Sequence, residues 1–181
     1  MAEVRLRDIK EEFGDQVALE YRSFMLRPEP DPTVTFNDYR RTNWQRATRE
    51  EPRTQFRLWE SEESYPKCSV PALEAAACAR LQGEEAFERF HFLVFRTLFT
   101  DNRDISDAKV LREVAEKGAL DMPRFVQDFE SHRLQGQVIE EYHEAVQRFG
   151  VTAIPTVLVN GKKLVGAVPA EEYRKAILRT L

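Results

Sequence analysis

The chain has 181 residues, of which 42% are hydrophobic and 32% charged, a balance typical of a folded protein and not of a disordered one. Its net charge is −4 and no long run of Lys or Arg occurs, so we expect no nucleic-acid partner. No stretch approaches the roughly 18 apolar residues of a membrane helix, and the first residues lack the apolar segment of a secretory signal. With only two cysteines, we expect a cytoplasmic protein without a disulfide framework.

The N-terminal part of the chain predicts one helix and one strand. Residues 4–13 carry apolar side chains at helical spacing and end before Gly14, which predicts a helix. Residues 17–26 are rich in β-prone side chains, with apolar residues on one face, and predict a strand. The prolines of residues 28–32 then predict a stiff, extended connection.

The middle of the chain predicts helices joined by loops. Thr35 is a candidate N-cap for a short helix, and residues 48–66 are interpreted as mostly loop. Residues 70–99 predict two helical parts with a break at Gly83. Cap signals and apolar periodicity then predict three more helices: one after Asp107 that stops near Gly118, one that begins at Asp121 and Pro123, and a long amphipathic one over residues 134–149.

The C-terminal part carries the most informative pattern. Residues 149–156 read Phe-Gly-Val-Thr-Ala-Ile-Pro-Thr, which is typical of a helix end closed by Gly150 and followed by a proline loop. A short buried strand comes next, and then Asn160 and Gly161, which favour a two-residue primed turn. A second strand and a last helix over about residues 169–181 complete the chain.

Several motifs in a fixed order carry a resemblance to a known family. They are Phe24-Met25-Leu26-Arg27-Pro28, Pro71-Ala72-Leu73-Glu74-Ala75-Ala76, the helix of residues 84–99, Arg103-Asp104-Ile105-Ser106-Asp107, the loop from Gly150-Val151 to Pro155-Thr156, and Gly166-Ala167. Together they resemble the DsbA family of thioredoxin-like proteins, in particular its FrnE-like branch. That branch is close to the 2-hydroxychromene-2-carboxylate isomerases and the kappa-class glutathione transferases. Each motif is weak alone, but the resemblance covers nearly the whole chain.

The resemblance implies an α/β, thioredoxin-like fold with an inserted all-helical domain. Residues 1–32 and 133–181 would form the thioredoxin-like domain, and residues 33–132 the insertion. In the family a loop proline is cis and faces the first cysteine of a Cys-x-x-Cys motif at a helix start. Pro155 would be that proline.

The same resemblance gives the candidate substrate-binding residues. Ala153, Ile154, Pro155 and Thr156 would bind an extended peptide or thiol substrate, with the backbone just before the proline pairing with the peptide. The first strand and the Cys-x-x-Cys motif of the family have no counterpart in the sequence.

Residues 4–13 would correspond to the back half of the redox helix, and the missing strand would lie between the strand of residues 17–26 and that of residues 156–159. The true start could lie upstream, the protein could be a truncated paralogue, or a partner chain could fill the gap. A truncated chain would have to close the gap by direct strand pairing, a swapped strand or a homodimer. Unpaired buried backbone groups cost about 1–3 kcal/mol each, against a total stability of about 5–15 kcal/mol.

The two cysteines are interpreted separately. Cys68 lies beside Lys67 and just before a predicted helix, an arrangement that lowers a thiol pKa, so a reactive thiol and an inert half-buried side chain both stay open. Cys78 follows three alanines and is expected in the core. Ten residues along one helix separate Cα atoms by about 15 Å, beyond the roughly 7 Å limit of a disulfide, so we expect no internal bridge. The three histidines lack metal-ligand spacing, and no metal is expected.

Three functional hypotheses follow. The first is a DsbA-family thiol–disulfide oxidoreductase homologue that is redox-inactive as written, because exchange needs the absent cysteine pair and no catalytic residue can be named. The second is a glutathione-dependent isomerase or transferase, with glutathione as the cofactor along the proline loop; otherwise no cofactor is expected. The third is a non-catalytic protein that uses its peptide groove or a homodimer interface.

Overall fold

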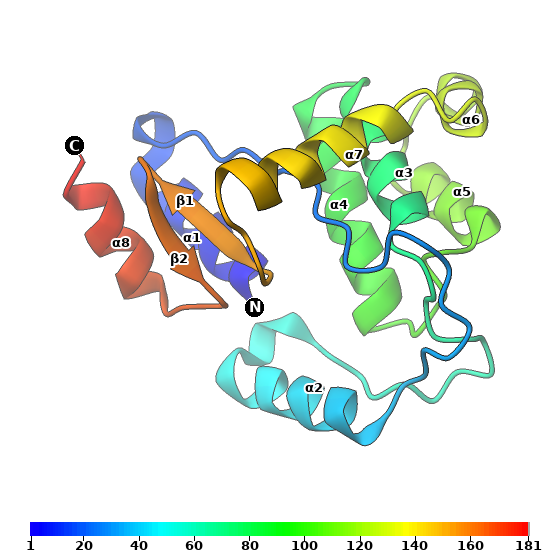
Figure 1. The fold of residues 1–181 in the computed structure, drawn as a ribbon, viewed down its shortest axis with the longest axis horizontal. Coiled ribbons are helices and arrows are strands. Elements are labelled where there is room, and N and C mark those ends of the chain that lie inside the picture. Colours follow the sequence, from blue (N-terminus) through cyan, green and yellow to red (C-terminus); the bar gives the residue numbers. More distant parts are fainter. Residues whose placement is uncertain (181) are drawn as a thin grey trace.

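A computed structural model describes residues 1–180, in which helices predominate and two short strands form the only sheet of this range (Figure 1). The α-helices run in chain order as α1 (Ala2–Phe13), α2 (Asp38–Glu50), α3 (Val70–Arg80), α4 (Glu84–Phe99), α5 (Ala108–Lys117), α6 (Met122–Glu130), α7 (Gln135–His143) and α8 (Ala170–Leu178). Short helical turns cover Gly14–Gln16, Pro52–Thr54 and Glu144–Arg148. Over residues 1–180 no helix is long and apolar enough to cross a membrane.

The sheet is an antiparallel hairpin of β1 (Thr156–Val159) and β2 (Lys162–Val165). Its turn residues Asn160 and Gly161 have φ of 45° and 86°, the left-handed values that a type I′ turn requires. The predicted strand–turn–strand hairpin is therefore confirmed, but its first strand was predicted as buried and is only partly buried, with Leu158 exposed.

Two separate apolar cores divide most of the molecule. The first, here the sheet lobe, joins α1, the hairpin and α8, with Ile9, Phe13, Leu164, Tyr173 and Ile177 at its centre. The second, here the helical lobe, joins α3, α4, α5 and α6. Its buried residues include Phe90, Leu111, Val114 and Phe125, each at most 1% exposed. Helix α7 runs between the two lobes (Figure 1).

The helical lobe forms where the sequence pattern predicts it. Gly83 breaks the α3–α4 run with φ of 110°, a conformation that costs glycine little. Asp107 caps α5 by accepting a hydrogen bond from the Lys109 N–H, and Asp121 caps α6 through the Arg124 N–H. These three helix boundaries were predicted from the sequence.

Helix α2 lies apart from the other helices, at the bottom of the view in Figure 1. The predicted cap at Thr35 is wrong, because the Asn37 side chain accepts the Arg40 N–H and the helix begins at Asp38. The predicted loop of residues 48–66 begins inside α2, which continues to Glu50. Trp44 of α2 contacts three aromatic rings, those of Phe36, Phe56 and Phe99, at centroid distances of 4.9, 5.6 and 5.0 Å. Because Phe99 belongs to α4, its contact with Trp44 connects α2 to the helical lobe.

Residues 17–26 are extended but do not pair as a strand, so this prediction is wrong. The alternation that suggested a strand is present, since side chains 17, 19, 21 and 23 are partly buried and those between them are exposed. Side chains replace a neighbouring strand as hydrogen-bond partners. The Ser23 N–H donates to the Glu141 carboxylate at 2.6 Å, and the Tyr21 carbonyl accepts from Arg80 at 3.1 Å. An alternating pattern predicts a half-buried extended segment, but a ladder also needs a partner strand.

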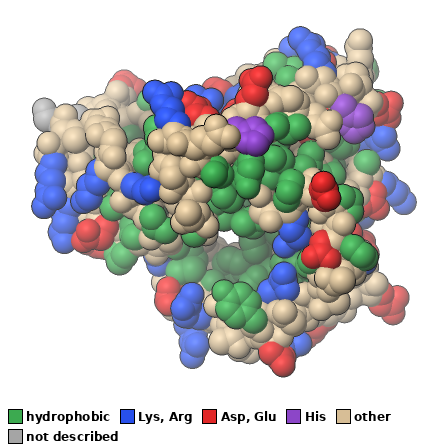
Figure 2. All heavy atoms as spheres, viewed as in Figure 1, with side chains coloured by type: hydrophobic (Ala, Val, Ile, Leu, Met, Phe, Trp, Pro, Cys, Tyr) green, Lys and Arg blue, Asp and Glu red, His purple; other side chains and the backbone are tan. Residues whose placement is uncertain are grey.

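Figure 2 shows one face of the molecule, with side chains coloured by type. On the face drawn there, hydrophobic side chains gather near the middle, around a hollow that separates the region of α2 from the rest. Large apolar side chains that stay exposed include Phe92 and Phe95 of α4 and Ile154 and Leu158 near the hairpin.

Candidate functional site

The predicted substrate loop connects the end of α7 to β1. After the turn Glu144–Arg148 the chain reaches Gly150, whose φ of 56° is the left-handed value expected of a helix-closing glycine. The Val151 N–H donates back to the Ala145 carbonyl at 2.9 Å, and the Val151 side chain is buried. One end of the loop is therefore anchored in the core.

A lysine from the hairpin holds the same helix end. The Lys163 Nζ donates to the carbonyl oxygens of Phe149 and Gly150, at 2.9 and 2.8 Å. A cation at a helix C-terminus is favourable, because the last carbonyls carry partial negative charge and lack intrahelical partners. The sequence analysis did not identify Lys163, and only its position two residues after an Asn-Gly turn could have pointed to it.

Residues 152–155 are exposed, and the Ile154–Pro155 peptide bond is cis. The Thr156 hydroxyl donates to the Ala153 carbonyl at 2.6 Å, and the Pro155 carbonyl accepts from the Gly166 N–H at 2.7 Å. These bonds fix both sides of the proline, while the Ile154 side chain stays 44% exposed. The structure thus places Ala153, Ile154, Pro155 and Thr156 together in one exposed, anchored loop.

The strand that follows the loop has one open edge. Within residues 1–180, β1 pairs only with β2, so its other side faces no strand. Alternate residues of an antiparallel strand direct their backbone groups to the partner. Since Pro155 bonds Gly166 of the β2 side, Thr156 and Leu158 direct their N–H and C=O groups to the open edge. β1 carries no charged side chain there, whereas β2 carries Lys162 and Lys163.

The two cysteines belong to α3 and the segment just before it, and both are free. Cys68 is partly buried just before α3, with its Sγ 3.6 Å from the Arg27 carbonyl oxygen and 3.8 Å from that of Pro28. Cys78 is completely buried in the helical lobe, where burial raises the pKa of its thiol to about 12. The expected core position of Cys78 is confirmed, and the reactivity of Cys68 stays a prediction.

The sequence analysis also did not identify a cluster of polar side chains near the start of α1. The Tyr21 hydroxyl donates to the Glu3 carboxylate at 2.9 Å, and the His91 Nε2 lies 3.7 Å from the same carboxylate. Burial opposes the charge of Glu3, but the interactions with His91 and Tyr21 outweigh it and hold the pKa of this carboxyl below its usual value. Burial and the nearby Glu3 charge raise the pKa of Tyr21.

No metal centre can be assigned within the described range, since residues 1–180 contain no group of three or more His, Cys, Asp or Glu side chains placed to hold an ion. The hydrogen bonds of the loop involve backbone carbonyl and N–H groups together with the side chains of Thr156 and Lys163. Backbone groups of this kind can form hydrogen bonds with another backbone.

Comparison with known proteins agrees with this geometry. The family profile of the DSBA-like thioredoxin domain matches residues 1–178. The uncharacterized protein YwbO of Bacillus subtilis strain 168 is 25% identical over 179 residues, which cover 91% of this chain and 82% of that protein. A crystal structure from Nitrosomonas europaea, named as that of a candidate protein disulfide isomerase, superposes with a TM-score of 0.75 at 17% identity and covers 98% of this chain and 87% of that one. The fold is therefore α/β and thioredoxin-like with a helical insertion, as expected from the sequence.

Proposed function

Because the chain belongs to the DSBA-like thioredoxin family, we propose that it is a homologue of thiol–disulfide oxidoreductases that binds an extended peptide at the loop Ala153 to Thr156. We further propose that residues 1–181 by themselves do not catalyse disulfide exchange. The observation that carries the first part is the anchored, exposed loop beside the open edge of β1.

The open edge supports peptide binding through backbone hydrogen bonds. A peptide that adds to a sheet edge pairs with every second residue of the strand, and its side chains then alternate between the two faces. Thr156 and Leu158 offer these groups, and Ile154 lies exposed at the entry to the strand. Because the loop is already fixed by Thr156, Lys163 and Gly166, binding would cost little further ordering of the protein.

The second part of the proposal rests on the cysteines. Disulfide exchange begins with the attack of an accessible thiolate on the substrate sulfur. Cys78 is buried with a raised pKa, and the Sγ of Cys68 faces the backbone of residues 27 and 28. Both thiols are free, so neither is paired with a resolving cysteine.

Peptide binding can be tested by proline substitution on the two edges of the hairpin. Leu158→Pro removes an N–H from the open edge of β1, and Val165→Pro removes the corresponding outward N–H from β2. We expect amide chemical shifts of Thr156 and Leu158 to move on titration with an unfolded model peptide, and Leu158→Pro to abolish binding while Val165→Pro keeps it. Equal loss in both variants, or binding that leaves the β1 amides unmoved, would contradict the proposed site.

Catalysis can be tested with the insulin-reduction assay. We expect residues 1–181 to give the uncatalysed rate, with no change on Cys68→Ser. Turnover that Cys68→Ser removes would show that Cys68 is a catalytic thiol and would overturn the second part of the proposal. Retention on immobilised glutathione would favour the glutathione-dependent alternative instead, and a stable dimer that binds neither ligand would favour the structural one.

A further inference from the structure

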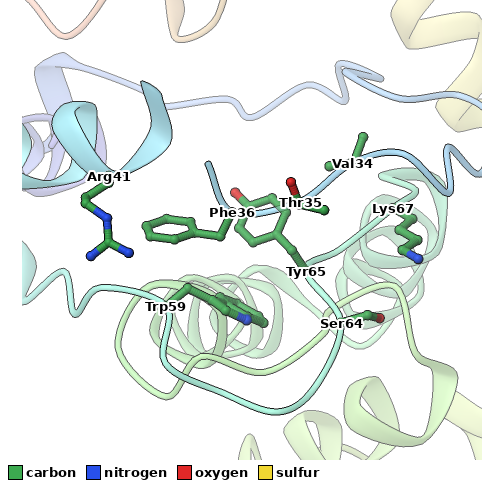
Figure 3. A pocket seen from close by; sticks show the side chains of 8 residues that line it. All are labelled: Val34, Thr35, Phe36, Arg41, Trp59, Ser64, Tyr65 and Lys67. Carbon is green, nitrogen blue, oxygen red and sulfur yellow. The ribbon is translucent and has the colours of Figure 1, made fainter. Parts of the chain in front are cut away.

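The segment around α2 is attached to the two lobes by contacts of different kinds. Toward the helical lobe it uses aromatic rings. Trp44 and Phe56 lie 5.0 and 4.5 Å from the Phe99 ring of α4, measured between centroids. Three further rings gather beside the N-terminal part of α2 in Figure 3, those of Phe36, Trp59 and Tyr65. On this side the segment is therefore held by a packed aromatic cluster.

Toward the sheet lobe the same segment uses charged groups. Glu51 follows α2 and is 7% exposed, and its carboxylate accepts from the Arg5 Nε of α1 at 3.3 Å and from the Arg53 Nε at 2.7 Å. Arg53 also donates to both carboxylate oxygens of Asp8 in α1, at 3.0 Å each. We call these four side chains the ionic clasp. In the part of the chain that the structure describes, every hydrogen bond and ion pair between residues 33–57 and the sheet lobe involves Arg5 or Arg53.

The charges of the ionic clasp are complementary. Hydrogen bonds from Arg53 hold the pKa of Glu51 and that of Asp8 below the usual values of these carboxyls. The Arg5 side chain is only 12% exposed and its guanidinium is always charged, so it needs acceptors for its N–H donors inside the protein. Glu51 supplies the negative charge that this arginine requires.

The other end of the Arg5 guanidinium reaches the turn after β2. Its Nη1 donates to the carbonyl oxygens of Ala167 and Val168, at 2.7 and 3.1 Å. Directly before them, the Gly166 N–H donates to the Pro155 carbonyl at 2.7 Å. Arg5 therefore holds the carbonyl side of the turn whose N–H holds the proline loop.

We propose that Arg5 is a positioning residue of the proposed peptide site, and that the Glu51 carboxylate keeps it in place. The contacts run from Glu51 to Arg5, from Arg5 to the turn of residues 166–168, and from this turn to the Pro155 carbonyl. Arginine suits this role, because its planar fork of donors can bind a carboxylate and carbonyl oxygens at the same time. The inference rests on the proposed peptide binding and extends the site to the segment around α2.

Breaking the ionic clasp should weaken peptide binding. Without Glu51, the guanidinium of Arg5 is no longer fixed on the turn, and the peptide must then supply the order that the loop has lost. Glu51→Ala makes this change. Glu50→Ala is the matched control, because the Glu50 side chain is 51% exposed, its ion pair with Arg46 is long, and its backbone carbonyl stays in the variant.

Two measurements by NMR follow the effect. In the free protein, hydrogen exchange of the Gly166 amide and of the Arg5 Nε–H should quicken by about tenfold or more in Glu51→Ala. In a titration with the unfolded model peptide, the dissociation constant should rise about tenfold. Glu50→Ala should change neither quantity. Arg53→Met removes the second donor from the Glu51 carboxylate at a position that is 55% exposed, and it should act in the same direction with a smaller effect.

The outcomes separate this inference from the proposed function. If the wild type binds the peptide and Glu51→Ala binds it equally well, the role of Arg5 is wrong and the peptide site stands. If the wild type binds no peptide, the proposed function is wrong, and the exchange of the Gly166 amide still decides whether Arg5 positions the turn. Equal exchange in Glu51→Ala and Glu50→Ala would overturn that role. Circular dichroism verifies that each variant is folded under the conditions of the titration.

Discussion

The helical lobe and the sheet lobe differ in how far each one closes on itself. In the helical lobe four helices surround a core with Phe90, Leu111 and Phe125 at most 1% exposed, and backbone groups pair within the helices. In the sheet lobe neither outer edge of the hairpin has a strand partner within residues 1–180, and the extended residues 17–26 depend on side chains for hydrogen bonds. The comparison teaches that the two lobes use their polar backbone differently: the helical lobe pairs its backbone groups internally around a packed core, and the sheet lobe leaves without a strand partner the backbone groups on which the proposed peptide binding depends.

The largest expected effect is the loss of packing in the helical lobe. Phe90→Ala removes a ring that is completely buried, and it should lower the free energy of unfolding by about 3–5 kcal/mol. Phe92→Ala makes the same change two residues away on α4, where the ring is 42% exposed, and should cost about 1 kcal/mol or less. Urea unfolding followed by circular dichroism measures both. If both variants lost the same free energy of unfolding, the described difference in burial between Phe90 and Phe92 would be wrong.

The second prediction concerns the side chain that replaces a strand partner. Glu141→Ala leaves the Ser23 N–H without its acceptor and should cost about 1–3 kcal/mol. Glu140→Ala, at the exposed neighbouring position of α7, should change the stability by no more than about 0.5 kcal/mol. Urea unfolding at neutral pH compares the two. An unchanged stability of Glu141→Ala would show that residues 17–26 do not depend on this carboxylate.

The same carboxylate gives a pH dependence with a defined sign. Burial opposes its charge, but hydrogen bonds from Gln137 and Ser23 outweigh burial and hold the pKa of Glu141 below its usual value near 4.5. A group with a lowered folded pKa stabilises the protein fully above its unfolded pKa and loses this contribution as the pH falls through the folded pKa. The stability difference between the wild type and Glu141→Ala should therefore be constant from pH 7 to about 5 and shrink below pH 4.5. A difference that grows on acidification would contradict this assignment.

The third prediction is that the substitution of glycine by alanine changes the stability in opposite directions at two positions. Gly150→Ala places a Cβ on a residue with φ of 56° and should destabilise the protein by about 1 kcal/mol. Gly136→Ala lies inside α7 with open space around the new Cβ, and it should stabilise by about 0.5–1 kcal/mol. Thermal unfolding of both variants measures the two shifts. Stabilisation by Gly150→Ala would mean that the loop begins in another conformation.

The smallest expected effect on stability concerns Lys163, which holds the start of the proline loop. Lys163→Met removes two hydrogen bonds to the end of the α7 segment while keeping the length of the side chain, and should cost about 0.5–1 kcal/mol. Lys162→Met is the matched change at a neighbouring exposed lysine of β2. Hydrogen exchange of the Val151 amide should quicken in Lys163→Met and stay unchanged in Lys162→Met. Equal exchange in both variants would exclude Lys163 as the residue that holds the loop.

The sequence predicted those parts of the fold that local chemistry determines. Gly83, Asp107 and the Asn160-Gly161 pair act through backbone preference and capping, so their positions alone locate two helix ends and a hairpin. The N-cap at Asn37 was assigned to Thr35, because both residues favour caps and periodicity cannot separate positions two residues apart. The strand of residues 17–26 was predicted wrongly because pairing is a non-local property.

The candidate site was predicted only in part, because some of its residues have a local sequence signature and others do not. The proline loop has a local signature, and the structure places its four residues together. Lys163 and Glu141 act across the fold, through bonds to residues at least 13 positions away in the sequence, and no local pattern distinguishes them from the other charged residues. The domain boundaries at residues 32 and 133 remain predictions.

The lysines of β2 have a consequence for self-association. An exposed strand edge can recruit further strands without limit unless one side discourages addition, and lysines placed along an edge are a common safeguard against runaway polymerisation. β2 carries Lys162 and Lys163, whereas β1 reads Thr-Val-Leu-Val. The two strands therefore differ: the charges of β2 disfavour the addition of a further strand at its edge, and β1 has no charged side chain that would do so.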